Sequence, residues 1–133
     1  HAAPINVQWG LDNRTVGLRV PDSGRESRRV ENRVPGADAN PYLAIAASLA
    51  CGLLGMQQKL DPSAPVTASA YDMPYELPRS LEQSLQALEN SDDLKEMLGT
   101  RFVQAWHAVK ESEYDTFLQV ISSWEREHLL LNV

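Results

Sequence analysis

The feature that most constrains this chain is a run of charged residues, Arg28-Arg29-Val30-Glu31-Asn32-Arg33. If this run forms a strand, Arg29, Glu31 and Arg33 lie on one face, because successive side chains of a strand point to opposite sides. Such a row is too charged for a core and unusual for an ordinary surface. It suits the phosphates of a nucleotide and the divalent cation that accompanies them, because guanidiniums bind phosphate and carboxylates bind Mg²⁺.

Arginine, not lysine, supplies the basic side chains near this run, since residues 1–40 contain six Arg and no Lys. Arg is favoured where a planar fork binds phosphate or carboxylate. The same residues carry five acidic groups, and residues 41–133 carry six basic and 13 acidic groups. This balance argues against a nucleic-acid partner, because contacts to a phosphate backbone call for a basic stripe with few carboxylates.

Length and composition are those of one globular domain, with 133 residues of which 43% are hydrophobic. Cys51 is the single cysteine, which excludes an internal disulfide and a thiolate zinc cluster. We expect this thiol to be buried and the protein to be cytoplasmic.

The apolar run 44–54 is too short to span a bilayer and the amino end lacks a signal pattern, so no membrane partner is expected. The start at His1 indicates an excised piece, and we give His1 no metal role.

Alternating apolar and polar residues predict strands at 5–9 and 15–20, and the charged run predicts a third strand over 28–34. Turn formers separate them at 10–13 and at 21–24.

Helices are predicted after these strands. Asn40 is a suitable N-cap and Pro41 a suitable first helical residue, so a helix begins there and runs to about Leu60. Small and apolar residues cover much of its circumference, which predicts a largely buried helix that backs the charged strands. Four prolines in residues 61–79 then predict an extended segment over a surface.

The rest of the chain is predicted to be helical. Ser80 and Gln83 match a capping box, residues 91–99 predict a short helical turn, and residues 101–129 predict a final helix. We interpret its apolar residues as core, because they recur at helical spacing: Phe102, Trp106, Val109, Phe117, Val120, Ile121 and Trp124. His107 and His128 are interpreted as scaffold.

The expected fold class is therefore α+β. Residues 1–38 form a few-stranded antiparallel sheet that carries the candidate site residues. Residues 39–133 are mostly helical, and the carboxy-terminal helices pack against the sheet.

Four short motifs occur in order along the chain: Asn13-Arg14-Thr15, Leu18-Arg19-Val20-Pro21, the run 28–33, and Ala39-Asn40-Pro41-Tyr42-Leu43. In order and near-matching spacing they resemble the carboxy-terminal part of the glutamine synthetase catalytic domain. The resemblance implies that residues 1–133 are a carboxy-terminal fragment of such a domain, with the sheet as part of its catalytic barrel. It also implies a homo-oligomer, a dodecamer-type ring, for the full-length protein.

Members of this family join the γ-carboxyl group of glutamate to an amine. They form γ-glutamyl phosphate with ATP, and the amine then displaces the phosphate. By resemblance, Arg14 and Arg19 contact the ATP phosphates and the transferring phosphoryl group, and Arg29 holds the nucleotide. The resemblance also implies that Glu31 is the ligand of the nucleotide-side Mg²⁺ or Mn²⁺. It places Arg33 at the glutamate side chain and its acyl phosphate, so that Arg14 and Arg33 would be the catalytic pair.

The chain departs from the family pattern in two places. The turn before Arg29 is one residue shorter, and Glu26 replaces a frequent lysine, for which Arg25 is a candidate substitute. Ala2 stands where the family has a flap glutamate that shields the acyl phosphate and helps to deprotonate ammonium. A missing acid suits a bulkier amine than ammonium, and residues 9–15 and 36–40 also resemble glutamylputrescine-type members more than ammonia-using ones.

The resemblance thus favours a γ-glutamylpolyamine synthetase, with putrescine or another polyamine as the amine. The alternatives are a glutamine synthetase that uses ammonia and a non-catalytic relative that keeps the fold. The fragment alone is expected to be inactive and to bind MgATP weakly or not at all. Tyr71 lies in a loop that resembles the adenylylated loop of some bacterial glutamine synthetases, and we interpret it as an ordinary loop tyrosine.

Overall fold

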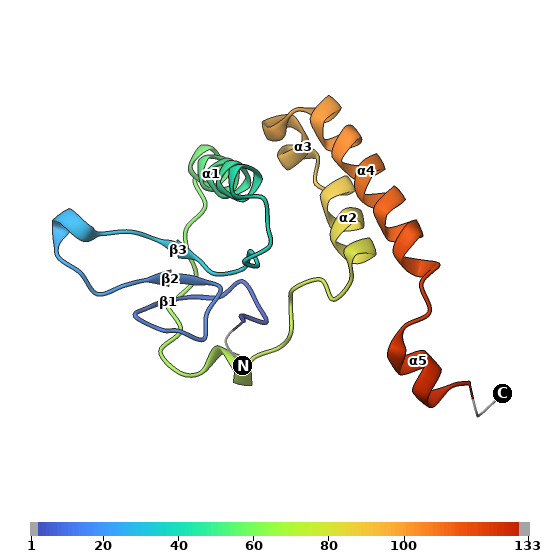
Figure 1. Cartoon of the computed structure of the whole chain (residues 1–133). Coiled ribbons are helices and arrows are strands. Elements are labelled where there is room, and N and C mark those ends of the chain that lie inside the picture. The colour runs from blue at the N-terminus through green and yellow to red at the C-terminus, as the bar shows by residue number, and fades with distance from the viewer. Residues whose placement is uncertain (1–2, 131–133) are drawn as a thin grey trace. The chain divides into compact units, whose positions relative to one another are not determined.

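The structure is a computed structural model that describes residues 3–130. It divides into two compact units, with the boundary between Pro78 and Arg79. Figure 1 labels the strands and the α helices of both. Unit 1 contains β1 (Trp9–Leu11), β2 (Leu18–Val20), the short 3₁₀ helix η1 (Arg25–Ser27), β3 (Glu31–Asn32), α1 (Pro41–Gln57) and η2 (Ala70–Asp72). Unit 2 contains α2 (Leu81–Glu89), α3 (Asp92–Leu98), α4 (Thr100–Leu118) and α5 (Ser123–His128).

The sheet has three strands in the order β1-β2-β3, so the α+β class with a few-stranded sheet is confirmed. The expected antiparallel pairing holds for β2 and β3. The pairing of β1 with β2 is parallel instead. The packing of the sheet on the carboxy-terminal helices stays a prediction.

The parallel pair is achieved with a short connection, residues 12–17, where parallel strands commonly need a long crossover. Each strand has only three residues, so the chain has to return by only about 10 Å. Asp12 begins the reversal with a positive φ of 48°, and the side chain of Asn13 closes a turn by accepting from the backbone N–H of Thr15. Val16 is fully buried in this connection, which fixes it to the unit.

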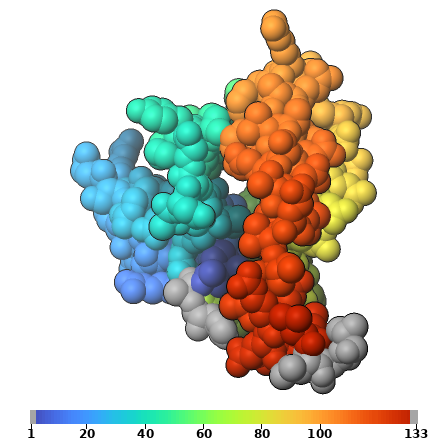
Figure 2. All heavy atoms as spheres, turned by 45° about the vertical axis from the view of Figure 1, so that its right-hand side comes forward, coloured from blue at the N-terminus to red at the C-terminus, as the bar shows by residue number. Residues whose placement is uncertain are grey.

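Helix α1 begins where the sequence predicts, because the side chain of Asn40 accepts from the backbone N–H groups of Tyr42 and Leu43. Asn32 of β3 donates to Ser48 of α1 over 2.9 Å, which ties the helix to the sheet. The prediction of a largely buried helix is wrong for this chain. Among its residues Ala50 is buried, whereas large apolar side chains and Cys51 are exposed, and Figure 2 shows the turquoise atoms of α1 at the surface. The sequence pattern indicates a helix that is apolar on all sides, but it does not indicate which part of the protein covers that helix.

The proline-rich segment 61–78 lies along the amino-terminal residues of unit 1 and is extended apart from the short helix η2. The indole N–H of Trp9 donates to the carbonyl of Ser63, and the backbone N–H of Val66 donates to the carbonyl of Trp9, both over 2.8 Å. Further along, the backbone N–H of Glu76 donates to the carbonyl of Ile5. The predicted extended segment over a surface is thus confirmed, and hydrogen bonds hold it in place.

Unit 2 is a helical unit in which α2 packs on α4 and α3 contacts both. Figures 1 and 2 both show α2 in yellow alongside α4 in orange. Leu85 of α2 and Val103 of α4 are the buried apolar residues of this unit in the described part of the chain. The side chain of Ser80 caps α2 by accepting from the backbone N–H of Gln83, which is one half of the predicted capping box. The other half differs, because the side chain of Gln83 accepts from the backbone N–H of Arg79 instead of Ser80.

The predicted final helix 101–129 is interrupted after Leu118. Ser122 and Glu125 form a capping box that starts α5, and this S-x-x-E pattern was present in the sequence. The expectation that the apolar residues of 101–129 form a core is also largely wrong. Exposed members are Phe102, Val109, Phe117, Val120, Ile121 and Trp124. His107 lies 3.8 Å from carboxylates of Glu89 and Glu111, and His128 stacks on Trp124. Their interpretation as scaffold stays a prediction. No helix within residues 3–130 has both the length and the apolar character needed to cross a membrane.

Candidate active site

The register of the sheet brings the charged residues together. In the antiparallel pair, Arg19 of β2 lies opposite Glu31 of β3, so their side chains share one face of the sheet. The backbone N–H of Arg33 donates to the carbonyl of Gly17, which extends the pairing by one step beyond β3. A side chain at position 17 would collide with the carbonyl of Asn6, since an added Cβ would lie 2.6 Å from that oxygen. Glycine therefore permits the close approach of the chain beside Arg33.

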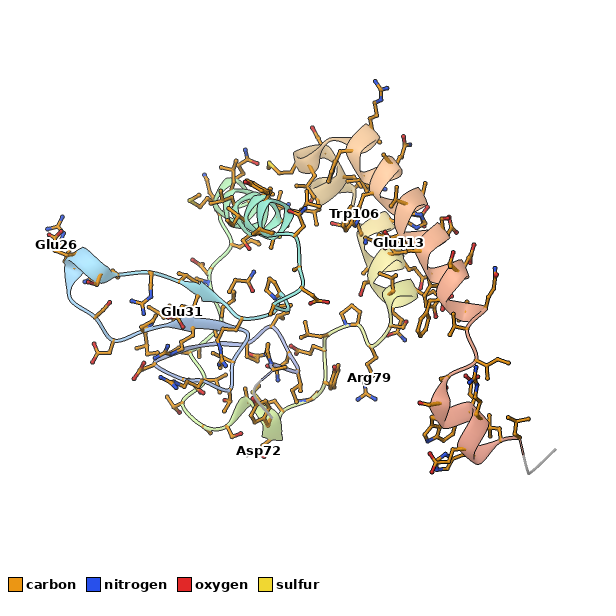
Figure 3. All side chains as sticks on the ribbon, in the orientation of Figure 1. Glu26, Glu31, Asp72, Arg79, Trp106 and Glu113 are labelled. Carbon is orange, nitrogen blue, oxygen red and sulfur yellow. The ribbon has the colours of Figure 1, made fainter. Side chains whose placement is uncertain are left out.

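The carboxylate of Glu31 lies between two guanidiniums. Arg19 Nη1 donates to Oε2 over 2.9 Å, and Arg29 donates to Oε1 from Nε over 3.2 Å and from Nη2 over 3.0 Å. Figure 3 shows Glu31 at the sheet, whereas Glu26 projects from the far end of the loop that joins β2 to β3. The arrangement holds one negative group against two positive ones at fixed distances.

The position of the partners differs in part from the sequence prediction, which placed Glu31 between Arg29 and Arg33. The structure places it between Arg29 and Arg19. The physical reason is the cross-strand register, because Arg19 lies directly opposite Glu31 while Arg33 lies opposite Gly17.

Asp12 is a member of the cluster that sequence reasoning missed. Its carboxylate accepts from Arg19 Nη2, so Arg19 bridges Asp12 and Glu31. The side chain of Arg19 is 14% exposed, compared with 58% for Asp12. The signal in the sequence was a turn-forming Asp next to Asn13, and its pairing with Arg19 depends on the parallel register of β1 and β2 that the sequence did not predict.

These contacts shift the protonation equilibria of the cluster. Hydrogen bonding to Arg19 lowers the pKa of Glu31 below its ordinary value, and Arg29 adds to this effect against the opposing effect of desolvation. Glu31 and Asp12 in turn raise the pKa of Arg19. Glu31 is therefore a carboxylate anion at neutral pH, as a metal ligand has to be.

The two residues predicted to be catalytic are joined to each other. Arg33 Nη1 donates to the backbone carbonyl of Arg14, which lies in the connection between β1 and β2. The side chain of Arg14 is exposed and that of Arg33 is half-buried. The structure thus brings Arg19, Arg29 and Glu31 into one contact group and links Arg33 to the loop that carries Arg14.

Glu31 fits the role of a single protein ligand to a divalent cation. A carboxylate has about four acceptor positions, and three of those of Glu31 accept guanidinium N–H groups. One position on Oε2 remains. Residues 3–130 contain no group of three or more His, Cys, Asp or Glu side chains that could hold a metal alone. Mg²⁺ is commonly bound by one or two carboxylates together with phosphate oxygens and water, so the residues present fit a metal that arrives with a nucleotide.

The residues that depart from the family pattern lie away from this contact group or outside the described residues. Arg25 and Glu26 lie in η1 and are exposed, as is Arg28. Ala2, at the flap position, and His1 lie outside the described residues. Tyr71 lies in η2 and is half-buried.

Comparisons with known proteins identify the wider family. The chain is 41% identical to "Type-1 glutamine synthetase 2" of Dictyostelium discoideum over 134 residues, which is 96% of this chain and 26% of the relative. It is 40% identical to "Gamma-glutamylputrescine synthetase PuuA" of Escherichia coli K12 over 131 residues, which is 97% of this chain and 28% of the relative. The chain therefore spans about a quarter of the length of these curated relatives.

A solved structure has the same fold. The structure titled "Apo GmaS without ligand" superimposes with a TM-score of 0.83 at 34% sequence identity, and the match covers 98% of this chain and 31% of that one. The family described as "Glutamine synthetase, catalytic domain" matches residues 1–129. A match over nearly the whole chain, together with the arginine cluster around Glu31, shows that this chain belongs to the glutamine synthetase catalytic-domain family.

Proposed function

We propose that the protein carrying this chain is an ATP-dependent ligase that joins the γ-carboxyl group of glutamate to an amine. In the first step a γ-carboxylate oxygen attacks the terminal phosphorus of ATP and ADP leaves. In the second step the amine nitrogen attacks the acyl carbon, phosphate leaves and the nitrogen loses a proton. The observation that carries the proposal is the carboxylate of Glu31 held between the guanidiniums of Arg19 and Arg29, in a chain of this family.

In this reaction the arginines would oppose negative charge that accumulates on phosphoryl oxygens. Arg14 and Arg33 are the proposed catalytic residues, and Arg14, Arg19 and Arg29 the proposed nucleotide-binding residues. The bond from Arg33 to the carbonyl of Arg14 supports this assignment, because it keeps the two residues near one another. Since Glu31 and Asp12 occupy two nitrogens of Arg19, a nucleotide would displace Asp12 or bind beside it.

Glu31 is the proposed ligand for Mg²⁺ or Mn²⁺. When bound, such a cation neutralises charge on the phosphate oxygens and helps to hold them in line for transfer. The chain's own contribution is a fixed anion, because Arg19 and Arg29 orient the carboxylate and keep it ionised.

Residues 1–133 alone are proposed to be inactive as a ligase. They supply one carboxylate to the metal, and they span about a quarter of the length of the curated relatives. The proposed functional form is a cytoplasmic homo-oligomer of the full-length protein, arranged as a dodecamer-type ring.

A polyamine such as putrescine is the proposed amine. It is supported by Ala2, which stands in place of the flap glutamate, and by the relative named for γ-glutamylputrescine synthesis. Ammonia is the second candidate, because the relative named a glutamine synthetase is equally similar in sequence. A non-catalytic relative that keeps the fold is the third, and retention of all five charged site residues argues against it.

The test is ATP turnover by the full-length protein with glutamate and one of three amines: ammonium, putrescine or spermine. We expect the highest kcat/KM with a polyamine and a glutamyl amide in the product. A preference for ammonium would overturn the choice of amine and leave the ligase assignment intact, whereas absence of turnover with every amine would favour the non-catalytic relative. Glu31→Gln, which removes the charge and keeps the shape, should abolish turnover, and Glu26→Gln in the exposed loop is its matched control.

A further inference from the structure

The residues on either side of Arg14, Asn13 and Thr15, belong to one hydrogen-bonded group. Asn13 Oδ1 accepts from the backbone N–H of Thr15 over 2.9 Å and from its hydroxyl over 2.7 Å. The amide nitrogen of Asn13 donates to the carbonyls of Val66 and Ala68 over 3.0 and 2.9 Å. Every polar position of the Asn13 amide group is thereby used, which fixes its orientation.

Thr15 extends this hydrogen-bonded group to the proline-rich segment 61–78. Its hydroxyl oxygen accepts from the backbone N–H of Ala70 over 2.8 Å while its proton goes to Asn13. The bonds therefore run in one direction, from Ala70 through Thr15 to Asn13, an arrangement in which each bond strengthens the next. Valine at position 15 would keep the shape and break both hydroxyl bonds.

Ala70 is a firm anchor for this chain of bonds. It is fully buried, and its carbonyl accepts from the amide of Asn6, another fully buried residue, over 2.8 Å. Both backbone polar groups of Ala70 are thus held, one by Thr15 and one by Asn6. The bond to Asn6 is buried and the bond to Thr15 is partly buried. Such bonds are costly to break, because the separated groups find little water.

This hydrogen-bonded group is linked to both arginines of the proposed catalytic pair. Asn13 and Thr15 immediately flank Arg14, and the carbonyl of Arg14 accepts from the guanidinium of Arg33. A shift of the loop would therefore move the backbone of Arg14 and the acceptor of Arg33 together. A misplacement of about 1 Å in a catalytic group can cost about 100-fold in rate.

We propose that Asn13 and Thr15 are positioning residues, which fasten the Arg14 loop to the backbone of Val66, Ala68 and Ala70 and so place Arg14 and Arg33 for phosphoryl transfer. The inference rests on the proposed function for its catalytic consequence. The bonds themselves stand independently of it, and the experiment keeps the two apart.

The first measurement follows the bonds. In Thr15→Val, the amide of Ala70 should lose its protection against hydrogen exchange, and it should regain it in Thr15→Ser. Thr67→Val is the matched control, because it makes the same change at an exposed position of the same segment. If the Ala70 amide exchanges equally in Thr15→Val and the unchanged protein, the positioning bond is absent and the inference is overturned.

The second measurement follows catalysis by the full-length protein. Thr15→Val should lower kcat by about 10- to 100-fold and change the KM for glutamate and ATP by less than about threefold. Thr15→Ser should restore most of the loss, and Thr67→Val should have no effect. Asn13→Asp keeps the acceptor for Thr15 but loses the amide donors, so it should also lower kcat and provides a second variant if Thr15→Val folds poorly.

The third measurement asks whether Thr15 acts through Arg14. In an Arg14→Ala background, Thr15→Val should cause little further loss of kcat, since residues that act as one unit are not additive. A full additional loss, or a change confined to KM, would overturn the positioning role. If Arg14→Ala itself left ligation unchanged, the assignment of Arg14 under the proposed function would fail, while the exchange of the Ala70 amide would still report the bond.

Discussion

The two units of this chain differ in the contacts that hold each unit together internally. In unit 1, side chains bond to backbone groups 53 to 64 positions away, as Asn6, Asn13 and Thr15 do. In unit 2, Leu85 and Val103 are buried among packed helices, and the side-chain bonds of Ser80 and Ser122 at the helix ends span three positions. Apolar packing fixes whole elements, whereas a directional polar bond fixes one backbone atom. The unit with the charged cluster adds long-range bonds of the second kind to its buried apolar residues, which is what exact placement of charges requires.

The largest expected effect is the loss of activity when a charge of the proposed site is removed from unit 1. Arg14→Ala in the full-length protein should lower kcat for ATP-dependent ligation by about 100- to 1000-fold, because a fixed charge that opposes phosphoryl charge is lost. Arg28→Ala, an exposed arginine of the same unit, should retain activity. Equal losses in the two variants, measured by steady-state kinetics, would mean that Arg14 has no special position.

The next effect tests the apolar packing of unit 2. Val103→Ala should destabilise this unit by about 2 kcal/mol, because it removes two buried methyl groups and leaves a cavity. Val109→Ala on the same helix should be close to neutral, since Val109 is 53% exposed and alanine favours helix. Chemical denaturation followed by circular dichroism measures both, and similar midpoints for the two variants would contradict the described core.

A smaller effect is expected at the start of α5. Ser122→Ala should cost about 1 kcal/mol of local helix stability, because it removes the acceptor for the backbone N–H of Glu125. This corresponds to an exchange rate of that amide about fivefold higher. Ser123→Ala, one position inside the helix, is the control. An unchanged rate in Ser122→Ala would show that the capping box contributes nothing in solution.

The smallest expected effect is a pH dependence from the Glu31 cluster, which is partly exposed. The pKa of Glu31 is lowered in the folded chain, so its contribution to stability is present above the ordinary pKa of about 4.3 and is lost as the pH falls through the lowered value. Urea midpoints at pH 7 and pH 3 should therefore differ less in Glu31→Gln than in the unchanged chain. Glu26→Gln should behave like the unchanged chain, and a Glu31→Gln variant with undiminished pH dependence would refute Glu31 as its source.

The sequence predicted the parts that depend on local chemistry. Asn40 and Ser80 start helices where their caps indicate, and the prolines of 61–79 give an extended segment. The α+β class and the family followed from these elements and the motifs around Arg14, Arg19 and Glu31. The assigned roles of the site residues stay predictions.

Other parts depend on register and on partners that a pattern does not contain. The contact of Glu31 with Arg19 in place of Arg33 follows from strand pairing across 12 positions. The exposure of α1 could not be predicted, because an apolar sequence indicates that a helix can be covered without saying by what. The break before α5 was predictable from Ser122 and Glu125, but the longer apolar periodicity outweighed that short pattern.

The bonds from Asn13 and Thr15 to residues 66–70 have a consequence for the order of events during folding. Strands β1 and β2 are joined by a short connection, so they can meet early, whereas residue 15 meets residue 70 only after a loop of 55 residues has closed, at a cost in chain entropy. We therefore expect the Arg14 loop to reach its final conformation late. We expect a nascent chain that ends before Ala70 to have a formed strand pair and a mobile Arg14.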